Sequence, residues 1–134
     1  MHKPGSRNMV GILGADPHET STICRLIQTG AYRTRVFGSL AELHRCSPEE
    51  WLAVILDIDS LPLDNRTIRN LTSTYPAVAF FCTSRERFHP EIKEAICHHL
   101  FACLNKPIDA DELHYLLKCV SDDGRTPERP MEYG

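Results

Sequence analysis

The stretch Leu52-Ala-Val-Ile-Leu-Asp57 decides the fold of this 134-residue chain, because it is apolar without interruption and then ends in an acid. A strand that exposes one face alternates apolar and polar residues, whereas a strand that is covered on both faces is apolar throughout. The stretch therefore predicts a central strand of a parallel sheet with helices on both faces. Asp57 lies at the carboxyl end of this strand, and Asp59 follows two residues later.

Four other segments are also predicted to be strands. In chain order they are Met9–Leu13, Arg33–Phe37, Ala77–Cys82 and Phe101–Leu104. Segments with helical spacing separate them, so strands and helices alternate along the chain. This alternation predicts an α/β fold with an open parallel sheet, because parallel strands are joined by right-handed crossovers.

Capping residues and apolar spacing mark the predicted helices. Three helices begin with a capping box, in which a glutamate follows the capping residue three positions later; the capping residues are Asp16, Ser39 and Asp109. Gly30 is the predicted left-handed stop of the first helix. Pro90 can begin another helix. Apolar residues at helical spacing indicate one more, over Ile68, Leu71 and Tyr75.

Composition and charge exclude several classes of protein. The chain is 42% hydrophobic, and its formal net charge of −3 is unlike the basic surface that a nucleic-acid-binding protein needs. Its longest apolar runs are far shorter than the roughly 20 residues that cross a bilayer. We therefore expect a cytoplasmic protein that binds neither nucleic acid nor membrane directly. One domain is predicted over residues 8–121, with a flexible tail at 1–7 and a flexible tail or linker at 122–134.

The six cysteines form no C-x-x-C pair, and several fall within predicted strands or helices. This pattern favours free thiols that fill the core over a disulfide framework. Cys97, His98, His99 and Cys103 are close in the sequence, but neighbouring residues on a helix point about 100° apart and do not easily converge on one ion. Ordinary packing is therefore the favoured interpretation.

Polar residues stand at the carboxyl ends of the predicted strands, where an open parallel sheet binds its ligands. Asp57, Thr83 and Lys106 belong to three different strand ends, so the fold brings a carboxylate, a hydroxyl and an amine to one edge. The set suits phosphoryl chemistry, with a nucleophile, a hydrogen-bond donor and a neutralising cation in that order. Each residue alone is more simply a solvated loop residue, so the interpretation depends on their joint position.

The order and spacing of these motifs resemble the receiver domain of bacterial two-component response regulators over residues 8–121. Val-Ile-Leu-Asp57, followed by Pro62 and Asp64, looks like the phospho-acceptor strand and its loop. Cys82-Thr83-Ser84 resembles the hydroxyl-bearing fourth strand, and Leu104-Asn-Lys106-Pro107 resembles the Lys-Pro signature. The resemblance implies a flavodoxin-like sheet in the strand order 2-1-3-4-5 and a cis peptide bond before Pro107.

The resemblance also implies a regulatory domain, with at most self-phosphorylation and self-dephosphorylation as its own activity. A histidine kinase or phosphotransfer protein would phosphorylate Asp57, Thr83 and Lys106 would sense the phosphoryl group, and Mg²⁺ would bind at the acidic pocket. The modified domain would then regulate an output domain or a partner protein. A homodimer is one form that such domains take.

The acidic pocket departs from the family's pattern. Family members usually carry two adjacent acids after the first strand, and this chain has Gly14-Ala15 there, so Mg²⁺ binding at Asp57 is expected to be weak or absent. Asp59 is a candidate substitute ligand, because alternate residues of an extended segment point to the same side. Its simpler interpretation is a solvent-facing acid. Asp16 is a second candidate, although helix capping explains it more economically.

A second departure is Cys103, which stands where the family has an aromatic switch residue. Coupling to the opposite face is expected to be altered, because a thiol lacks the bulk and the hydroxyl of tyrosine. The charged segment 85–89 has two interpretations. It is either a solvated loop or a binding site for an acidic partner or phosphate. The missing acids also support an alternative function, a pseudo-receiver that keeps the fold as a protein-interaction module and is not switched by phosphate.

Overall fold

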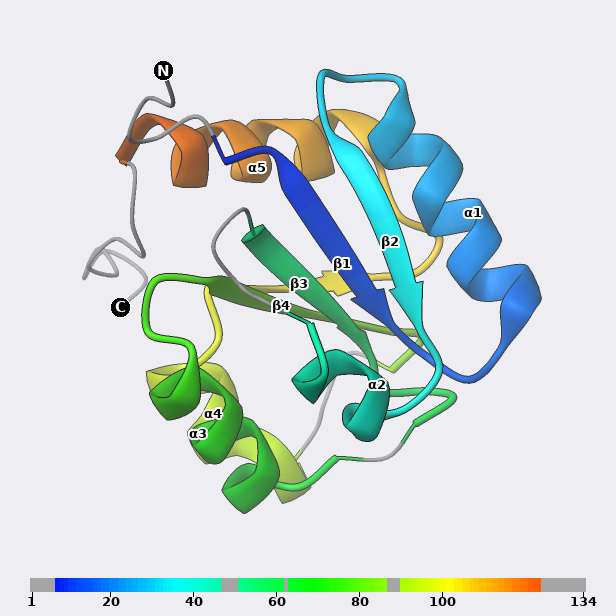
Figure 1. Cartoon of the computed structure of the whole chain (residues 1–134). Coiled ribbons are helices and arrows are strands. Elements are labelled where there is room, and N and C mark those ends of the chain that lie inside the picture. Colours follow the sequence, from blue (N-terminus) through cyan, green and yellow to red (C-terminus); the bar gives the residue numbers. More distant parts are fainter. Residues whose placement is uncertain (1–6, 47–50, 62, 87–89, 124–134) are drawn as a thin grey trace.

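The computed structural model of the chain describes residues 7–46, 51–61, 63–86 and 90–123. Five parallel strands form one sheet in the order β2-β1-β3-β4-β5 (Figure 1). The strands are β1 (Met9–Leu13), β2 (Arg33–Phe37), β3 (Trp51–Asp57), β4 (Ala79–Ser84) and β5 (Ala102–Asn105). The predicted fold class and strand order are therefore confirmed.

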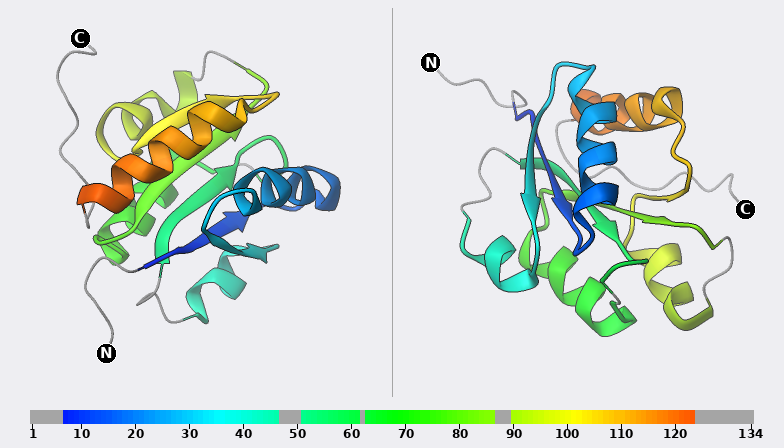
Figure 2. Two further views of the ribbon diagram at one scale, coloured as in Figure 1. Left: turned by 90° about the horizontal axis from the view of Figure 1, so that it is seen from above. Right: turned by 90° about the vertical axis from the view of Figure 1, so that its right-hand side faces the viewer.

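Helices cover both faces of the sheet (Figures 1 and 2). One face carries α1 (Pro17–Gln28) and α5 (Ala110–Asp123). The other carries α2 (Leu40–His44), α3 (Asn65–Thr74) and α4 (Lys93–His98). Each face has its own apolar core, because successive side chains of a strand point to opposite faces. We call the two sides the α1/α5 face and the α2/α3/α4 face.

Every residue of β3 is buried, in agreement with its uninterrupted apolar sequence. Val54 and Leu56 enter the core of the α2/α3/α4 face, and Ile55 enters the core of the α1/α5 face. Asp57 ends the strand two residues after Ile55. The central strand thus carries a fully buried acid to the edge of the sheet where the apolar core stops.

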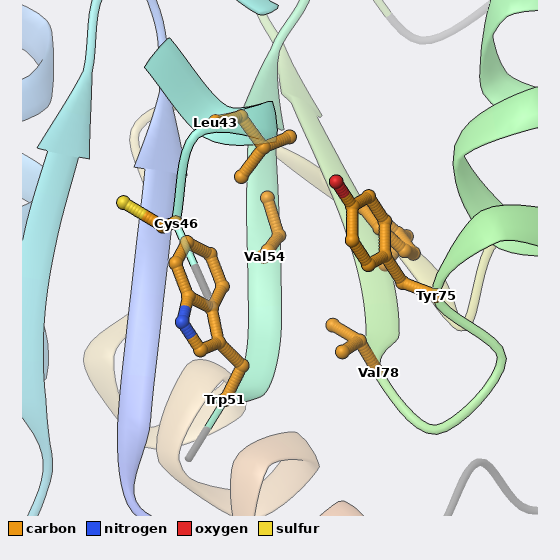
Figure 3. Close-up of a pocket in the computed structure, with 7 residues that line it drawn as sticks. Leu43, Cys46, Trp51, Val54, Tyr75 and Val78 are labelled. Carbon is orange, nitrogen blue, oxygen red and sulfur yellow. The ribbon is translucent and has the colours of Figure 1, made fainter. Parts of the chain in front are cut away.

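Apolar side chains close around a small void on the α2/α3/α4 face (Figure 3); those that line it include Leu43, Cys46, Trp51, Val54, Tyr75 and Val78. The void measures about 10 Å³, the space of about one water molecule, so it is not a ligand site. Nearby, the Trp51 ring stacks on Phe37 with ring centroids 5.1 Å apart. Gly11 leaves room for this ring, because a Cβ there would lie 2.5 Å from it.

The bounds of β4 differ from the prediction at the functional edge. The strand covers residues 79–84 and not 77–82, so Thr83 and Ser84 belong to it. The sheet pairs Thr83 with Asp57 and Ser84 with Asn105. The sequence pattern ends a strand at its last apolar residue, but the backbone ladder continues through polar residues. β5 ends at polar Asn105 for the same reason, and it also begins one residue later than predicted, at Ala102.

One predicted helix end is wrong, and one predicted helix start is confirmed with a 3-10 first turn. Gly30 is not left-handed, because α1 ends in a right-handed C-cap at Thr29 and the Gly30 N–H bonds to the Ile27 oxygen in a continuing turn. Pro90 begins a short 3-10 helix over Pro90–Ile92, and α4 starts only at Lys93. The predicted capping by Asp16 is confirmed, since its side chain accepts hydrogen bonds from the N–H groups of His18 and Glu19.

The described residues reach into both predicted tails. Nη1 of Arg7 donates to the main-chain oxygens of Trp51 at 3.2 Å and Ala77 at 2.8 Å. At the other end α5 continues to Asp123. The rest of both tails, Pro62 and the segment 87–89 lie outside the described residues. None of the helices that the structure describes is long and apolar enough to cross a membrane.

The cysteines are partly as predicted. Those that the structure describes have free thiols, which confirms that part of the prediction for them. Only Cys82 among them is fully buried, and the partly exposed ones are Cys24, Cys46, Cys103 and Cys119. The structure does not describe the side chain of Cys97. Most of the described thiols therefore lie at the margin of the core and not inside it.

Candidate functional site

The carboxyl edge of the sheet brings Asp57, Thr83 and Lys106 together. The Asp57 side chain is fully buried. Its Oδ1 accepts hydrogen bonds from Lys106 Nζ at 2.8 Å and from the Asp59 N–H at 3.3 Å, and its Oδ2 accepts one from the Ser60 hydroxyl at 3.1 Å. A buried carboxylate needs such partners, because an unpaired charge is costly to remove from water.

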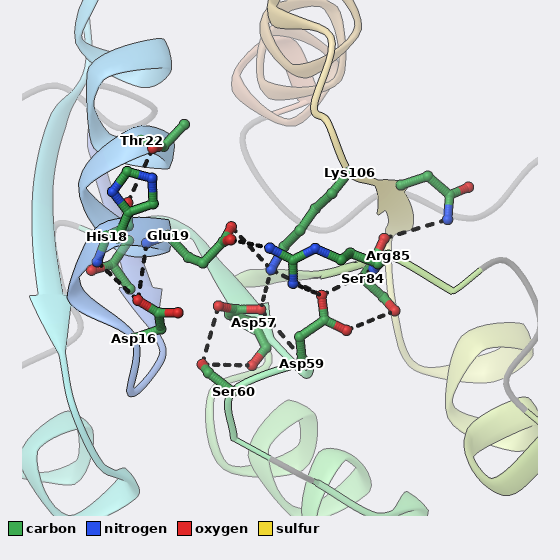
Figure 4. Close-up of polar contacts among 12 residues, drawn as sticks. Asp16, His18, Glu19, Thr22, Asp57, Asp59, Ser60, Ser84, Arg85 and Lys106 are labelled. Carbon is green, nitrogen blue, oxygen red and sulfur yellow. Dashed lines mark hydrogen bonds and ion pairs between the residues drawn. The ribbon is translucent and has the colours of Figure 1, made fainter.

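Lys106 is the cation at the centre of the site (Figure 4). Its side chain is 7% exposed, and Nζ lies 2.8 Å from Asp57 Oδ1, 3.0 Å from Asp59 Oδ2 and 3.3 Å from Glu19 Oε1. Burial alone would lower the pKa of Lys106, but hydrogen bonds to Asp57 and Asp59 outweigh burial and raise that pKa above its ordinary value. The peptide bond to Pro107 is cis, as the resemblance implies. Lys106 is therefore a charged group that three carboxylates share.

Arg85 is a second cation, and it lies between Glu19 and Asp59 (Figure 4). Its guanidinium group pairs with Glu19, and its Nη1 lies 3.5 Å from Asp59 Oδ2. The Arg85 N–H donates to the same oxygen at 3.0 Å. The Arg85 side chain is 61% exposed, against 17% for Glu19. Arg85 thus covers the cluster from the solvent side.

Asp59 turns back toward the cluster. Its Oδ1 accepts a hydrogen bond from the Ser84 hydroxyl at 3.2 Å, and its Oδ2 faces Lys106 and Arg85. Burial alone would raise the pKa of Asp59, but hydrogen bonds from Lys106, the Arg85 N–H and Ser84 hold that pKa below its ordinary value. Asp59 is therefore an anion with cationic partners, an arrangement that neither interpretation of the sequence included.

Thr83 is buried next to Asp57, its partner across β3 and β4. Among the described residues, Thr83 Oγ1 is the buried side-chain polar atom without a hydrogen-bond partner. A buried hydroxyl that is left unsatisfied costs about 1–3 kcal/mol, so stability does not explain its presence here. A free hydroxyl beside a carboxylate is available to an oxygen of a ligand.

The space around Gly14 is already filled. Gly14 is buried, and a Cβ there would lie 3.0 Å from Asp57 Cβ and 3.0 Å from Thr20 Cγ2. Ala15 is exposed, and its N–H donates to Ser60 Oγ at 3.0 Å. Ser60 in turn donates to Asp57 Oδ2. A serine hydroxyl therefore connects the loop after β1 to Asp57, on the side where the resemblance leads one to expect acids.

The residues present do not fit Mg²⁺. This ion is usually held by one or two carboxylates together with water and phosphate oxygens. Here both carboxylate oxygens of Glu19, Asp57 and Asp59 already face an N–H, ammonium, guanidinium or hydroxyl donor. No group of His, Cys, Asp or Glu side chains within the described residues is arranged to hold a metal ion. Glu19, Asp57 and Asp59 are thus engaged by protein donors, and the other candidate ligand, Asp16, caps α1.

Cys103 lies beside Cys82, its partner across β4 and β5. The two Sγ atoms are 2.7 Å apart. Both side chains belong to the α2/α3/α4 face, where Cys82 is buried and Cys103 packs against the core. The hydrogen bond with Cys103 and burial raise the pKa of the Cys82 thiol. The position expected to hold an aromatic residue therefore holds one member of a thiol pair.

Two members of the site escaped the sequence analysis. The sequence assigns Glu19 to a capping box, but the structure corrects this assignment, because the Glu19 carboxylate pairs with Arg85 and Lys106 instead. Its main partner is 66 positions away in the chain, so no local pattern could reveal the contact. Ser60 gave no signal beyond being a hydroxyl three residues after Asp57. Arg85 belongs to the charged segment that the sequence singled out.

A cleft of about 550 Å³ opens beside the cluster. One wall is α1, from His18 to Leu26, and the other wall is residues 106–108. Arg85 also lines the cleft. Glu19 and Lys106 contribute to both the cleft and the ion cluster. A ligand that enters the cleft therefore meets Arg85 and Lys106.

No protein-family model and no curated protein matches the sequence. Solved structures match nearly the whole chain. The signal receiver domain of an HD domain-containing protein from Pseudomonas fluorescens has a TM-score of 0.74 and 15% identity, with 92% of this chain and 93% of that chain covered. A CheY-like response regulator receiver domain protein from Methanospirillum hungatei has a TM-score of 0.74 and 13% identity, with 89% and 97% covered.

A third similar structure is a protein from Burkholderia pseudomallei that is provisionally described as pilus assembly-related. Its TM-score is 0.74 at 14% identity, and the match covers 97% of this chain and 98% of that one. At such identities the likeness concerns the fold. The solved structures that this chain resembles include response regulator receiver domains, and the chain has their fold.

Proposed function

We propose that this chain is a receiver domain that accepts a phosphoryl group on Asp57 from a histidine kinase or phosphotransfer protein, and regulates an output domain or a partner protein. The observation that carries the proposal is the buried Asp57 carboxylate 2.8 Å from Lys106 Nζ, beside a buried Thr83 hydroxyl without a partner among the described residues. A nucleophile, a cation and a free donor are the groups that phosphoryl transfer needs.

The transfer forms one bond and breaks one. An Asp57 oxygen attacks the phosphorus of a phosphohistidine, the P–O bond forms as the P–N bond breaks, and the leaving imidazole nitrogen takes the bonding pair and a proton. Oδ2 is the better placed nucleophile, because Oδ1 is held by Lys106 and the Asp59 N–H, whereas Oδ2 accepts from the rotatable hydroxyl of Ser60. Lys106 then neutralises charge on the phosphoryl group, and Thr83 donates to one of its oxygens.

The cleft between α1 and residues 106–108 supports this proposal, because it opens beside Lys106, whose ammonium group contacts Asp57. A phosphohistidine side chain that enters there passes Arg85 and Lys106. Both cations attract the phosphoryl group before transfer. The first partner we propose is thus a protein that presents a phosphohistidine to the surface of α1.

Phosphorylation can be tested with small donors. Acetyl phosphate or phosphoramidate is incubated with the full chain, with and without Mg²⁺, and the intact mass is measured. We expect an adduct of about 80 Da on the parent and none on Asp57→Asn. Asp111→Asn, which changes an exposed carboxylate on α5, is the matched control and should carry the adduct. Absence of the adduct on the folded parent under every condition would contradict the proposal.

One observation favours a second function. Arg85 and Lys106 already engage every carboxylate of the cluster, and such a self-satisfied site suits a pseudo-receiver that binds a partner through its fold and is not switched by phosphate. The same experiment separates the two functions. A folded parent without an adduct supports the interaction module, whereas an adduct confined to Asp57 supports the receiver domain.

A further inference from the structure

We propose that phosphoryl acceptance by Asp57 is independent of Mg²⁺, because Arg85 and Lys106 supply the positive charge that holds the phosphoryl group. The inference rests on the proposed function and adds Arg85 to the residues that perform it. It starts from the disagreement between the fold, which implies a metal ion, and the acids of the site, which are all engaged by protein donors.

Charge balance shows why a second cation is needed. The cluster has the carboxylates of Glu19, Asp57 and Asp59 against the cations Arg85 and Lys106. A phosphoryl group carries about −1.5 to −2 charges, so phosphorylation makes this cluster more negative. Lys106 alone is already shared by three carboxylates, and the acids offer no unoccupied oxygen to a metal ion. Among the residues that the structure describes, the remaining cation at the site is Arg85.

Arg85 can reach a phosphoryl group by exchanging partners. Its side chain is 61% exposed, so a new rotamer meets little obstruction from the core. The planar guanidinium group matches a phosphate with two parallel hydrogen bonds. Asp59 stays satisfied when this group leaves, because the Ser84 hydroxyl, the Arg85 N–H and Lys106 still donate to it. Glu19 likewise keeps Lys106 at 3.3 Å.

The exchange makes Glu19 a competitor of the phosphoryl group. Glu19 holds Arg85 in the unmodified chain, and the phosphoryl group must replace Glu19 as the partner of the guanidinium. Removing the charge of Glu19 therefore frees Arg85, and Glu19→Gln should be labelled faster than the parent. Glu112→Gln, an exposed acid of the first turn of α5, is the matched control and should leave the rate unchanged.

The rate of labelling with and without metal tests the inference. Phosphoramidate is added to the full chain in excess Mg²⁺ or in excess EDTA, and the adduct is followed by intact mass. We expect equal rates within about twofold. An adduct that forms only with Mg²⁺ overturns this inference and leaves the proposed function standing. Absence of an adduct in both solutions overturns the proposed function, and the inference with it.

Variants of Arg85 test its role directly. In EDTA, Arg85→Ala should lose about tenfold or more of the labelling rate, because it removes a donor that stabilises charge on the phosphoryl group. Mg²⁺ should partly rescue this variant, because Glu19 and Asp59 lose a cation. Arg85→Lys keeps the charge without the planar guanidinium group, so its labelling rate should be intermediate. Arg69→Ala, at an exposed arginine of α3, should be labelled at the rate of the parent. An Arg85→Ala rate equal to that of the parent overturns the inference.

Metal binding itself gives a readout that does not depend on labelling. Backbone amide resonances of Ala15, Asp59 and Arg85 are followed during a titration with Mg²⁺ alone. We expect no saturable shift on the parent, because no carboxylate oxygen of the site is free. Saturable shifts centred on these residues would overturn the inference even if labelling failed. Asp59→Ala, titrated in parallel, separates binding at Asp59 from binding elsewhere.

We also infer, from an independent observation, that Cys82 and Cys103 form a disulfide when the chain meets a peroxide. The two residues are direct partners on β4 and β5, and their Sγ atoms lie 2.7 Å apart. Neighbouring strands are about 4.8 Å apart, which falls within the Cα separation of about 4.4–6.8 Å that a disulfide spans. The backbone therefore does not have to move far to join them.

The exposures of the two thiols give the order of the steps. Cys103 is partly exposed and Cys82 is buried, so the peroxide oxidises Cys103 first. The Cys103 sulfur takes one oxygen to become a sulfenic acid, and the peroxide is reduced to water or an alcohol. The Cys82 sulfur then attacks the Cys103 sulfur, the S–S bond forms, and the sulfenic oxygen leaves as water with the thiol proton. Burial and the raised pKa of Cys82 agree with its acting second.

Peptide mapping tests this site. The reduced full chain is treated with hydrogen peroxide, blocked with an alkylating agent and digested without reductant. We expect a linked peptide pair that contains Cys82 and Cys103, and its loss in Cys103→Ser. Cys24→Ser is the control and should keep the pair. Oxidation of Cys103 to sulfinic acid in the parent without linkage, or a parent in which both thiols remain alkylated, would overturn the inference.

Discussion

The ammonium group of Lys106 lies 2.8 Å from a carboxylate oxygen of Asp57, and both side chains are almost completely withdrawn from water. An intact buried ion pair adds little net stability, but removal of one partner leaves the other charge buried and unpaired. In this chain the remaining charge would be a carboxylate at the end of the central strand. The stability of the sheet and the state of the candidate site are therefore linked through this pair.

Lys106→Met should strongly destabilise the fold. The change leaves Asp57, Asp59 and Glu19 without their shared cation, and loss of one partner of a buried pair costs about 3–5 kcal/mol. The free energy of unfolding in urea measures the effect. Lys93→Met, at an exposed lysine of α4, should differ from the parent by less than about 0.5 kcal/mol. Equal stabilities for the two variants would show that the Lys106 contacts do not matter to the fold.

Thr83→Val should stabilise the unmodified chain by about 1 kcal/mol, because it removes a buried hydroxyl that has no partner among the described residues. The same change should slow labelling of Asp57, since a donor to the phosphoryl group is lost. Thr20→Val is the matched control. Its hydroxyl is also buried but donates to the Pro17 oxygen at 3.1 Å, so this variant should lose stability. Thermal unfolding of both variants decides whether the Thr83 hydroxyl is kept for a ligand.

Gly14→Asp should destabilise the fold by about 1–3 kcal/mol, the usual cost of overpacking. Its Cβ would meet Asp57 Cβ and Thr20 Cγ2 at 3.0 Å, and its carboxylate would lie close to that of Asp57. Ala15→Asp, at an exposed position, should be tolerated. Urea unfolding measures both changes, and a Mg²⁺ titration of each variant shows whether one acid recreates a metal site. Full stability of Gly14→Asp would mean that the space can open.

Acid should weaken the fold through Asp59. Its pKa is lower in the folded chain than its ordinary value of 3.8, so the folded chain binds fewer protons than the unfolded chain in the window just below that value. The stability that Asp59 contributes is complete above about pH 4 and is lost as the pH falls through the folded pKa. Unfolding free energies measured from neutral pH downward should fall less steeply for Asp59→Asn than for the parent.

The comparison needs a control for the other acids. Asp111→Asn should keep the slope of the parent. A residual slope is expected in every variant, because a hydrogen bond from the Thr67 N–H lowers the pKa of Asp64 as well. Asp59→Asn and the parent with identical slopes would show that Lys106 and Arg85 do not hold the Asp59 carboxylate in solution.

The fold was predictable because its strongest signals are local or periodic. The apolar run that ends at Asp57 marks a doubly covered strand, and Asp16 marks a helix start that the structure confirms. The end of β4 was not predictable in this way. Thr83 and Ser84 are polar, and only the ladder with β3 and β5 shows that they belong to the strand.

The sequence predicts the site residues that lie at strand ends. It does not predict the residues whose side chains reach the site from other elements. Asp57, Thr83 and Lys106 follow from where strands end in a parallel sheet. The role of Glu19 depends on a side chain that leaves its own helix to meet Arg85, and a capping motif gives no indication of that choice. Asp59 shows the same limit, since its partners follow from the positions of Lys106 and Ser84 in space.

The bridge that Arg85 makes between Glu19 and Asp59 also has a consequence for the history of this chain. Loss of Arg85 alone leaves Glu19 and Asp59 to share Lys106 with Asp57, and loss of Glu19 alone changes the charge balance around Lys106. Neither substitution is neutral by itself, so we expect positions 19 and 85 to vary together among close relatives.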